Sequence, residues 1–279
     1  MNIPRYWEKA TGEADAPDGS RLDLTAWGWS HLDRHEARRT AAERLRRMIS
    51  RVTAGERLGG KYPYGNALRE EIVKEIVDGD DVPRALITRN SYGALVLNAP
   101  DFMFIDVDLP REPAGQWLRK LFGRKPTTTA DEHLLRLQEA LAKASDATFR
   151  LYRTAAGFRV LATSRKFEPG SAEAERVMTA AGADPSYVQL CRAQRSFRAR
   201  LTPKPFRLRW KLPPNRYPRT GEEEQAFRKW LATYEQKSQG ASVCRYLSEV
   251  GNRHTDPAIA PLLRLHDEAT RAHTELPLA

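Results

Sequence analysis

Cysteines and long apolar runs are scarce in this sequence, and each shortage narrows the possible classes of protein. Cys191 and Cys244 are the only cysteines among 279 residues and form no Cys-x-x-Cys pair, which argues against a disulfide framework or a zinc site. No apolar run approaches the roughly 18 residues of a membrane-spanning helix. The first residues, Met1 to Trp7, contain no apolar segment of the kind found in secretory signals. We therefore expect a protein of the reducing cytoplasm with no membrane partner.

Several catalytic patterns are missing as well. The sequence has no Gly-x-x-x-x-Gly-Lys-Ser/Thr motif, which argues against a P-loop nucleotidase. It has no Gly-x-Ser-x-Gly motif, which argues against the serine hydrolases that use a nucleophile elbow. Its six histidines show no metal-ligand spacing. Each histidine is therefore interpreted as an ordinary surface or core residue.

Acidic residues are absent from one long stretch, Pro185 to Gly221, although the chain has 36 of them. This acid-free stretch carries ten positive residues, as many as the net charge of +10: Arg192, Arg195, Arg198, Arg200, Lys204, Arg207, Arg209, Lys211, Arg216 and Arg219. Such a local concentration of charge predicts a polyanionic partner. Arginine outnumbers lysine in it, which suits bidentate contacts to phosphate. The alternative is a basic face that is merely solvated.

The order of predicted elements indicates an α+β fold. Short apolar runs bounded by Asn, Gly and Pro predict strands at 84–88, 94–98, 102–109, 148–154 and 158–163, with a hairpin turn at 90–93. Residues 197–201 and 206–210 are predicted as edge or loop-like strands because Pro203 and Pro205 interrupt them. Helices are predicted at 31–52, 67–77, 130–144, 171–181, 185–192, 222–238 and 257–273, and residues 1–30 look irregular.

These elements predict three parts that form one compact unit. Residues 1–82 are expected to form a helical N-terminal flank, residues 83–212 an α+β core, and residues 213–279 a helical C-terminal flank. The core is expected to contain one mixed or antiparallel central sheet with helices on at least one face.

Two carboxylates on the predicted strand 102–109 are the strongest candidates for chemistry. Side chains alternate between the faces of a strand, so Asp106 and Asp108 share one face of an otherwise apolar segment. Two negative charges on an apolar strand cost free energy unless a nearby positive charge offsets them. A divalent cation with oxygen ligands, Mg²⁺ or Mn²⁺, is one solution. Ion pairs with some of the many arginines are the other, and both remain open.

The segment Phe104-Ile105-Asp106-Val107-Asp108 resembles the first motif of the archaeo-eukaryotic primase (primase-polymerase) superfamily. The run from Leu151 to Leu161 resembles the strand hairpin of the second motif, with Arg159 where that family has a nucleotide-binding histidine. Asp184 resembles the single acid of the third motif, and the basic segment 195–205 resembles the basic residues that the family has after that acid. The resemblance covers residues 84–210 and implies an RRM-like palm in the core.

This resemblance implies metal-dependent nucleotidyl transfer on nucleic acid with a nucleoside triphosphate. Asp106, Asp108 and Asp184 would hold Mg²⁺ or Mn²⁺ and act as the catalytic acids. The residues implied to bind nucleotide or nucleic acid are Arg153, Arg159, Arg195, Arg198, Arg200, Lys204 and Arg207. Since arginine cannot act as an acid or base near neutral pH, Arg159 leaves a catalytically silent binding protein open as an alternative. A metal-dependent nuclease or phosphohydrolase is a further alternative.

Overall fold

The computed structural model describes residues 1–58, 67–77, 83–109 and 130–279. In these ranges the chain has the predicted α+β class, with two four-stranded antiparallel sheets and a separate hairpin. The strands are β1 (Tyr6–Asp15), β2 (Arg21–Ser30), β3 (Glu71–Val77), β4 (Pro83–Arg89), β5 (Leu95–Ala99), β6 (Phe104–Asp108), β7 (Phe149–Thr154), β8 (Gly157–Ala162), β9 (Phe197–Arg200) and β10 (Cys244–Val250). The helices are α1 (Arg34–Thr53), α3 (Ala130–Ala144), α4 (Ala172–Ala180), α5 (Pro185–Gln194), α6 (Gly221–Ser238) and α7 (Ala260–Thr270), with a short 3₁₀ helix, η1 (Pro205–Leu208).

The first sheet contains β6, the strand of the two carboxylates. Its order is β10-β7-β8-β6, and every neighbouring pair is antiparallel. The predicted strands 148–154 and 158–163 are confirmed as the hairpin β7–β8. Gly157 begins β8 at a close approach, because an added Cβ would lie 1.9 Å from the Val107 carbonyl oxygen. Glycine therefore lets β8 pair with β6 right up to Asp108.

The second sheet has the order β3-β4-β5-β9. The predicted turn between its central strands is confirmed, with the Asn90 side chain accepting the N–H groups of Tyr92 and Ala94. Gly93 takes the positive φ of 81° that this turn requires. The structure thus divides the strands of residues 83–200 between two sheets, where one central sheet was expected.

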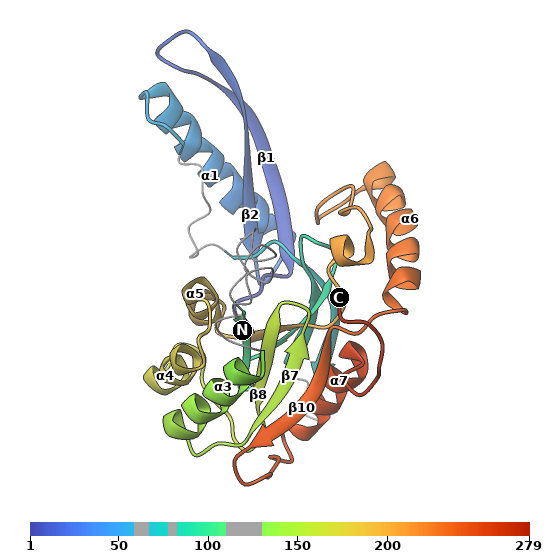
Figure 1. Ribbon diagram of the computed structural model, residues 1–279. Coiled ribbons are helices and arrows are strands. Elements are labelled where there is room, and N and C mark those ends of the chain that lie inside the picture. The colour runs from blue at the N-terminus through green and yellow to red at the C-terminus, as the bar shows by residue number, and fades with distance from the viewer. Residues whose placement is uncertain (59–66, 78–82, 110–129) are drawn as a thin grey trace, which may run out of the picture.

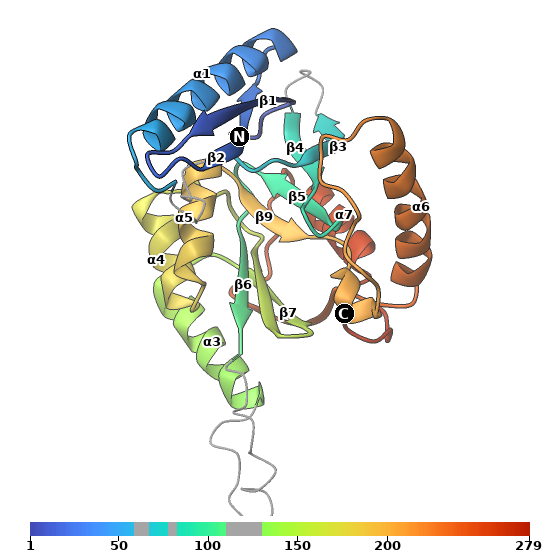
Figure 2. The same cartoon turned by 90° about the horizontal axis from the view of Figure 1, so that it is seen from above.

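The two sheets share a single hydrophobic core. Buried residues of both sheets, such as Leu97 in β5 and Leu151 in β7, belong to one cluster. Tyr187 of α5 ties the sheets together, because its hydroxyl lies 2.9 Å from the carbonyl oxygens of both Phe104 in β6 and Arg198 in β9. Helices α3, α4 and α5 lie on one side of the strands, with α6 and α7 on the other (Figures 1 and 2).

The N-terminal residues form an arm that projects from this body (Figure 1). The prediction that residues 1–30 are irregular is wrong, because they form the hairpin β1–β2. Helix α1, predicted at 31–52, packs on the hairpin around a small core of its own that includes Leu24 and Leu45. Gly28 allows the contact, since a Cβ there would lie 2.2 Å from the α1 backbone. These strands use Ala, Gly and charged residues, which carry little strand propensity, so their pattern was weak.

Two other elements differ from the prediction. Residues 67–77 were expected to be helical, but Glu71–Val77 is the edge strand β3. Its spacing of Ile and Val fits a helix as well as a strand, and pairing with β4 decides in favour of the strand. Residues 206–210 were expected to be extended but begin in the 3₁₀ helix η1, which Pro205 starts and Arg209, with φ of 54°, ends.

The C-terminal region contributes a strand as well as helices. Helix α6 confirms the prediction at 222–238, and α7 lies inside the predicted helix 257–273. Between them, β10 adds to the edge of β7 and was not predicted. Residues of β10 and α7, such as Cys244 and Leu262, belong to the same core cluster as the sheets. The C-terminal region therefore helps to build the surroundings of β6 and β8.

Candidate functional site

Asp106 and Asp108 lie at the C-terminal end of β6, which is an edge strand of the first sheet. The preceding residues Phe104 and Ile105 are fully buried, whereas both carboxylates reach the surface, with the Asp106 side chain 46% exposed. Across the sheet, Asp106 is opposite Arg159 of β8, and Asp108 is opposite Gly157. The predicted strand therefore places both acids on one face where solvent can reach them.

Arg159 pairs with Asp106 through two hydrogen bonds. Its Nε donates to Oδ1 at 2.7 Å and its second terminal nitrogen donates to Oδ2 at 3.0 Å. The Arg159 side chain has no exposed surface. Burial alone would raise the pKa of Asp106 and lower that of Arg159, but their attraction outweighs burial, so the pKa of Asp106 is lowered and that of Arg159 is raised. Both groups are therefore charged at neutral pH.

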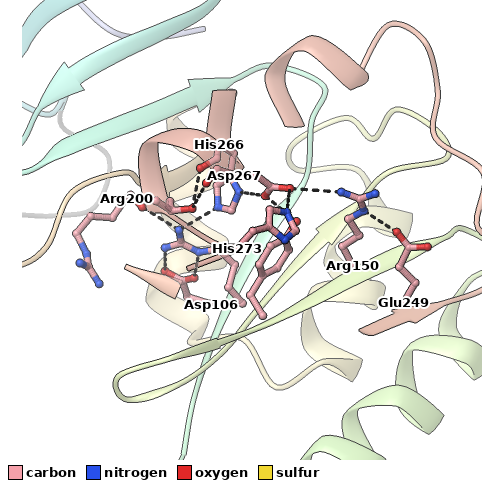
Figure 3. Close-up of polar contacts among 10 residues, drawn as sticks. Asp106, Arg150, Arg200, Glu249, His266, Asp267 and His273 are labelled. Atoms are coloured by element: carbon pink, nitrogen blue, oxygen red, sulfur yellow. Dashed lines mark hydrogen bonds and ion pairs between the residues drawn. The ribbon is translucent and has the colours of Figure 1, made fainter. Parts of the chain in front are cut away.

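A polar network that includes Arg200, His266 and Asp267 (Figure 3) holds the other side of the Arg159 guanidinium. Its remaining nitrogen donates to the Arg200 carbonyl oxygen at 2.8 Å and to Nε2 of His266 at 3.3 Å. His266 comes from α7, and its Nδ1 lies 2.9 Å from Asp267. Three further side chains contact the Asp267 carboxylate: Tyr152 at 2.8 Å, His273 at 3.2 Å and Arg150 at 3.3 Å. Residues of β9, α7 and β7 thus form the network that fixes the position of Arg159.

His266 was not expected at the site, because its sequence pattern is that of an ordinary histidine. Burial lowers its pKa, more than the Asp267 hydrogen bond raises it. A neutral ring with its proton on Nδ1 donates to Asp267 and leaves Nε2 as an acceptor for Arg159. The one signal in the sequence is its place on the apolar face of α7, with Leu262 four residues before it and Thr270 four residues after it, all buried.

The neutral state of His266 predicts a loss of stability in mild acid. Because its folded-state pKa is lowered, the stabilisation is present above the ordinary pKa of 6.5 and is lost as pH falls below it. The lowered pKa values of Asp106 and Asp267 act only below their ordinary value of 3.8. We expect the melting temperature to fall as the pH is lowered below about 6.5, and His266→Asn to reduce that dependence. Replacing the exposed His254 by Asn should leave the pH profile unchanged, and equal profiles for all three proteins would refute this role.

Three basic residues of the predicted set, Arg200, Lys204 and Arg207, lie close to one another. Burial and the neighbouring charge of Arg159 together lower the pKa of Arg200 to about 10. Burial and the charges of Arg200 and Arg207 lower the pKa of Lys204, while Asp108 and Asp106 act in the opposite direction. We call Arg159, Arg200, Lys204 and Arg207 the basic cluster. Arg200 and Lys204 thus lie near the carboxylates of β6, and Arg207 lies near Arg200 and Lys204.

Of the three other residues predicted to bind nucleic acid, Arg198 and Arg153 donate hydrogen bonds within the fold and Arg195 lies exposed at the end of α5. Arg198 is 8% exposed and donates to both oxygens of Glu70, at 2.7 and 2.8 Å. Arg153 donates to the Gly157 carbonyl oxygen within the β7–β8 hairpin. Arg195 is exposed and ends α5 in a left-handed conformation, with φ of 48°. The structure therefore gathers only part of the predicted basic set around the acids.

Asp184 is not brought together with Asp106 and Asp108. Its carboxylate caps the N-terminus of α5 by accepting the Ser186 N–H at 2.7 Å. Within residues 1–58, 67–77, 83–109 and 130–279, no three His, Cys, Asp or Glu side chains are arranged to hold a metal ion. A cation at this site would thus depend on the two carboxylates of β6, one of which is already paired with Arg159.

Comparisons with protein-family models, curated proteins and solved structures found no match to this chain. The resemblance to the primase superfamily therefore depends on the motif residues alone. Among the described helices, none is both long and apolar enough to cross a membrane.

Proposed function

We propose that this protein binds the phosphates of a nucleic acid strand or a nucleotide at the basic cluster. The observation that carries the proposal is the placement of Arg200 and Lys204 near the carboxylates at the end of β6, with Arg159 paired to Asp106 and Arg207 close to Arg200 and Lys204. Bound phosphate would offset the burial and the mutual repulsion that lower the pKa values of Arg200 and Lys204. Arginine and lysine supply the donors that phosphate oxygens prefer.

The Asp106–Arg159 pair favours binding without metal catalysis. Both oxygens of Asp106 accept hydrogen bonds from a fully buried guanidinium. A metal ion bound there would compete with these bonds, and the buried charge of Arg159 would lose its partner. In this proposal Asp106 orients Arg159, and the remaining cations of the cluster face the ligand. This corresponds to the silent binding protein among the alternatives.

Metal-dependent nucleotidyl transfer is the second candidate. It is favoured by Asp108, which is exposed two residues after Asp106 on the same strand face, with the positive charge of Lys204 nearby. On an RRM-like palm, these two carboxylates would hold Mg²⁺ or Mn²⁺ and Lys204 would neutralise phosphate charge. Asp184 lies outside this arrangement, so a third ligand would have to come from the substrate or solvent.

The proposal predicts salt-dependent binding that relies on Lys204 and Arg207. We expect a fluorescently labelled single-stranded oligonucleotide to bind the wild type at low salt, with affinity that falls as salt rises. Lys204→Ala and Arg207→Ala should each weaken binding and reduce the slope of log affinity against log salt by about 0.7, the release expected for one phosphate contact on a single strand. Fluorescence anisotropy over a salt series measures both quantities.

Lys143→Ala is the matched control, since it removes the same charge from an exposed position in the last turn of α3. We expect it to retain the wild-type slope. Absence of binding by the wild type at low salt, or equal losses in Lys143→Ala and Lys204→Ala, would count against a phosphate site at the basic cluster.

A further inference from the structure

Phe206 stands out in the acid-free stretch because its aromatic ring faces solvent. Its side chain is 55% exposed, although it lies in η1 between Pro205, which is buried, and Arg207. Another aromatic residue of this segment, Trp210, packs against the small core of α6 that contains Phe227 and Trp230. The exposure of Phe206 is therefore a local feature, and the fold does not use this ring to fill its core.

The backbone around Phe206 is held in one conformation. The Arg207 N–H donates to the Lys204 carbonyl oxygen at 3.0 Å, and the Trp210 N–H donates to that of Pro205 at 2.9 Å. Arg209, which ends η1, donates its N–H to the Phe206 carbonyl oxygen at 3.2 Å. The ring is thus presented from a closed turn, which limits the conformational entropy that a ligand would have to remove.

Two cations of the basic cluster flank this ring. Nζ of Lys204 lies 5.8 Å from the ring centroid, and the Arg207 guanidinium carbon lies 6.0 Å from it. Both side chains also lie near Arg200: the charge of Arg207 lowers the pKa of Arg200, and the charge of Arg200 lowers the pKa of Lys204. An apolar ring thus sits at the edge of a site whose charge suits phosphate. If an apolar surface of a partner protein bound here, it would bury the charges of Lys204 and Arg207 without supplying negative charge.

A nucleotide base matches this combination of ring and charge. Every base offers a flat π-face that stacks on an aromatic side chain, and the phosphates on either side of it carry the negative charge that the cations need. In a duplex the faces of the bases are covered by their neighbours, whereas unpaired bases can turn out and stack on protein rings. A site built from this ring and its cations would therefore favour a single strand over a duplex.

We propose that Phe206 is a stacking platform for an unpaired base of a single-stranded nucleic acid whose adjacent phosphates bind the basic cluster. This inference rests on the proposed function and adds the class of ligand: single-stranded, with little sequence preference. Lys204 and Arg207 would contact phosphates, while Phe206 would contribute contact area that does not depend on salt.

Phe206→Leu tests the platform, because leucine keeps an apolar side chain but removes the aromatic face. Phe206→Trp is the matched variant that retains a face for stacking. We expect Phe206→Leu to weaken binding of a labelled single-stranded oligonucleotide about 5- to 150-fold, the range measured for loss of one stacked base. Its salt slope and its affinity for duplex should equal those of the wild type. Phe206→Trp should bind the single strand at least as tightly as wild type, with its indole fluorescence quenched on binding.

Since the ring is exposed, we expect both variants to melt at the wild-type temperature, which separates loss of stacking from loss of folding. Wild-type affinity in Phe206→Leu, or equal losses for single strand and duplex, would overturn the platform. Failure of the proposed function looks different, since then the wild type itself would bind no oligonucleotide at low salt.

Discussion

Replacing Asp106 by asparagine should lower the free energy of unfolding by about 3 kcal/mol, the lower end of the range for breaking a buried ion pair. The lower end applies because Arg159 is fully buried but Asp106 is 46% exposed. Asparagine leaves the guanidinium without its anion and with one fewer acceptor. Asp108→Asn is the matched control on the same strand face. It should change stability by less than about 0.5 kcal/mol, as expected for an exposed residue.

Urea denaturation of the three proteins in EDTA measures this difference. If Asp106 and Asp108 were instead an empty metal site without an arginine partner, the two carboxylates would repel each other. Asp106→Asn would then raise the free energy of unfolding, because it removes one of the two repelling charges. A gain of stability in that variant would therefore contradict the assignment of Asp106 as the partner of Arg159.

Glu70→Gln should be at least as destabilising, by about 3 to 5 kcal/mol. Glu70 and Arg198 are both less than a tenth exposed, and the Glu70 carboxylate also accepts the Thr88 hydroxyl at 2.6 Å. Glutamine keeps the shape but leaves the positive charge of Arg198 buried without compensation. Thermal and urea melts of the variant give the loss directly.

The double variant Glu70→Leu with Arg198→Met is the control for this pair. Removing both charges together should recover most of the stability, because no uncompensated charge is left in the interior. It should also bind single-stranded oligonucleotide as the wild type does, since Arg198 faces Glu70 rather than the surface. A large loss of binding in the double variant would return Arg198 to the set of phosphate contacts.

The sequence was sufficient to predict strands β4 to β9 but not the edge strands β3 and β10. Strand β6 was predictable because its apolar run is too short for a helix and ends in two acids. At β3 the spacing of Ile72 and Ile76 fits both the helical and the strand period, and only pairing with β4 decides in favour of the strand. Strand β10 was missed because it is formed by pairing with β7, about 90 residues earlier in the chain.

The site was predictable as a set of residue types but not as a set of partners. The acid-free stretch contains Arg200 and Lys204, which lie near the carboxylates of β6, yet nothing local distinguishes them from Arg198. That distinction depends on Glu70, which is 128 residues away in the sequence. His266 is likewise 107 residues from Arg159. Long-range pairing of this kind leaves no trace in a single sequence, because either partner alone has an ordinary pattern.

The most direct test of the central claim is to titrate the wild type with labelled single-stranded oligonucleotide in EDTA and then with added Mn²⁺. A phosphate site made by the basic cluster predicts salt-dependent binding in EDTA, with little change when Mn²⁺ is added. It also predicts that Asp108→Asn binds at least as well, because a negative charge beside the phosphates has been removed. Binding that occurs only with Mn²⁺ and disappears in Asp108→Asn would contradict the account and identify the carboxylates of β6 as a metal site.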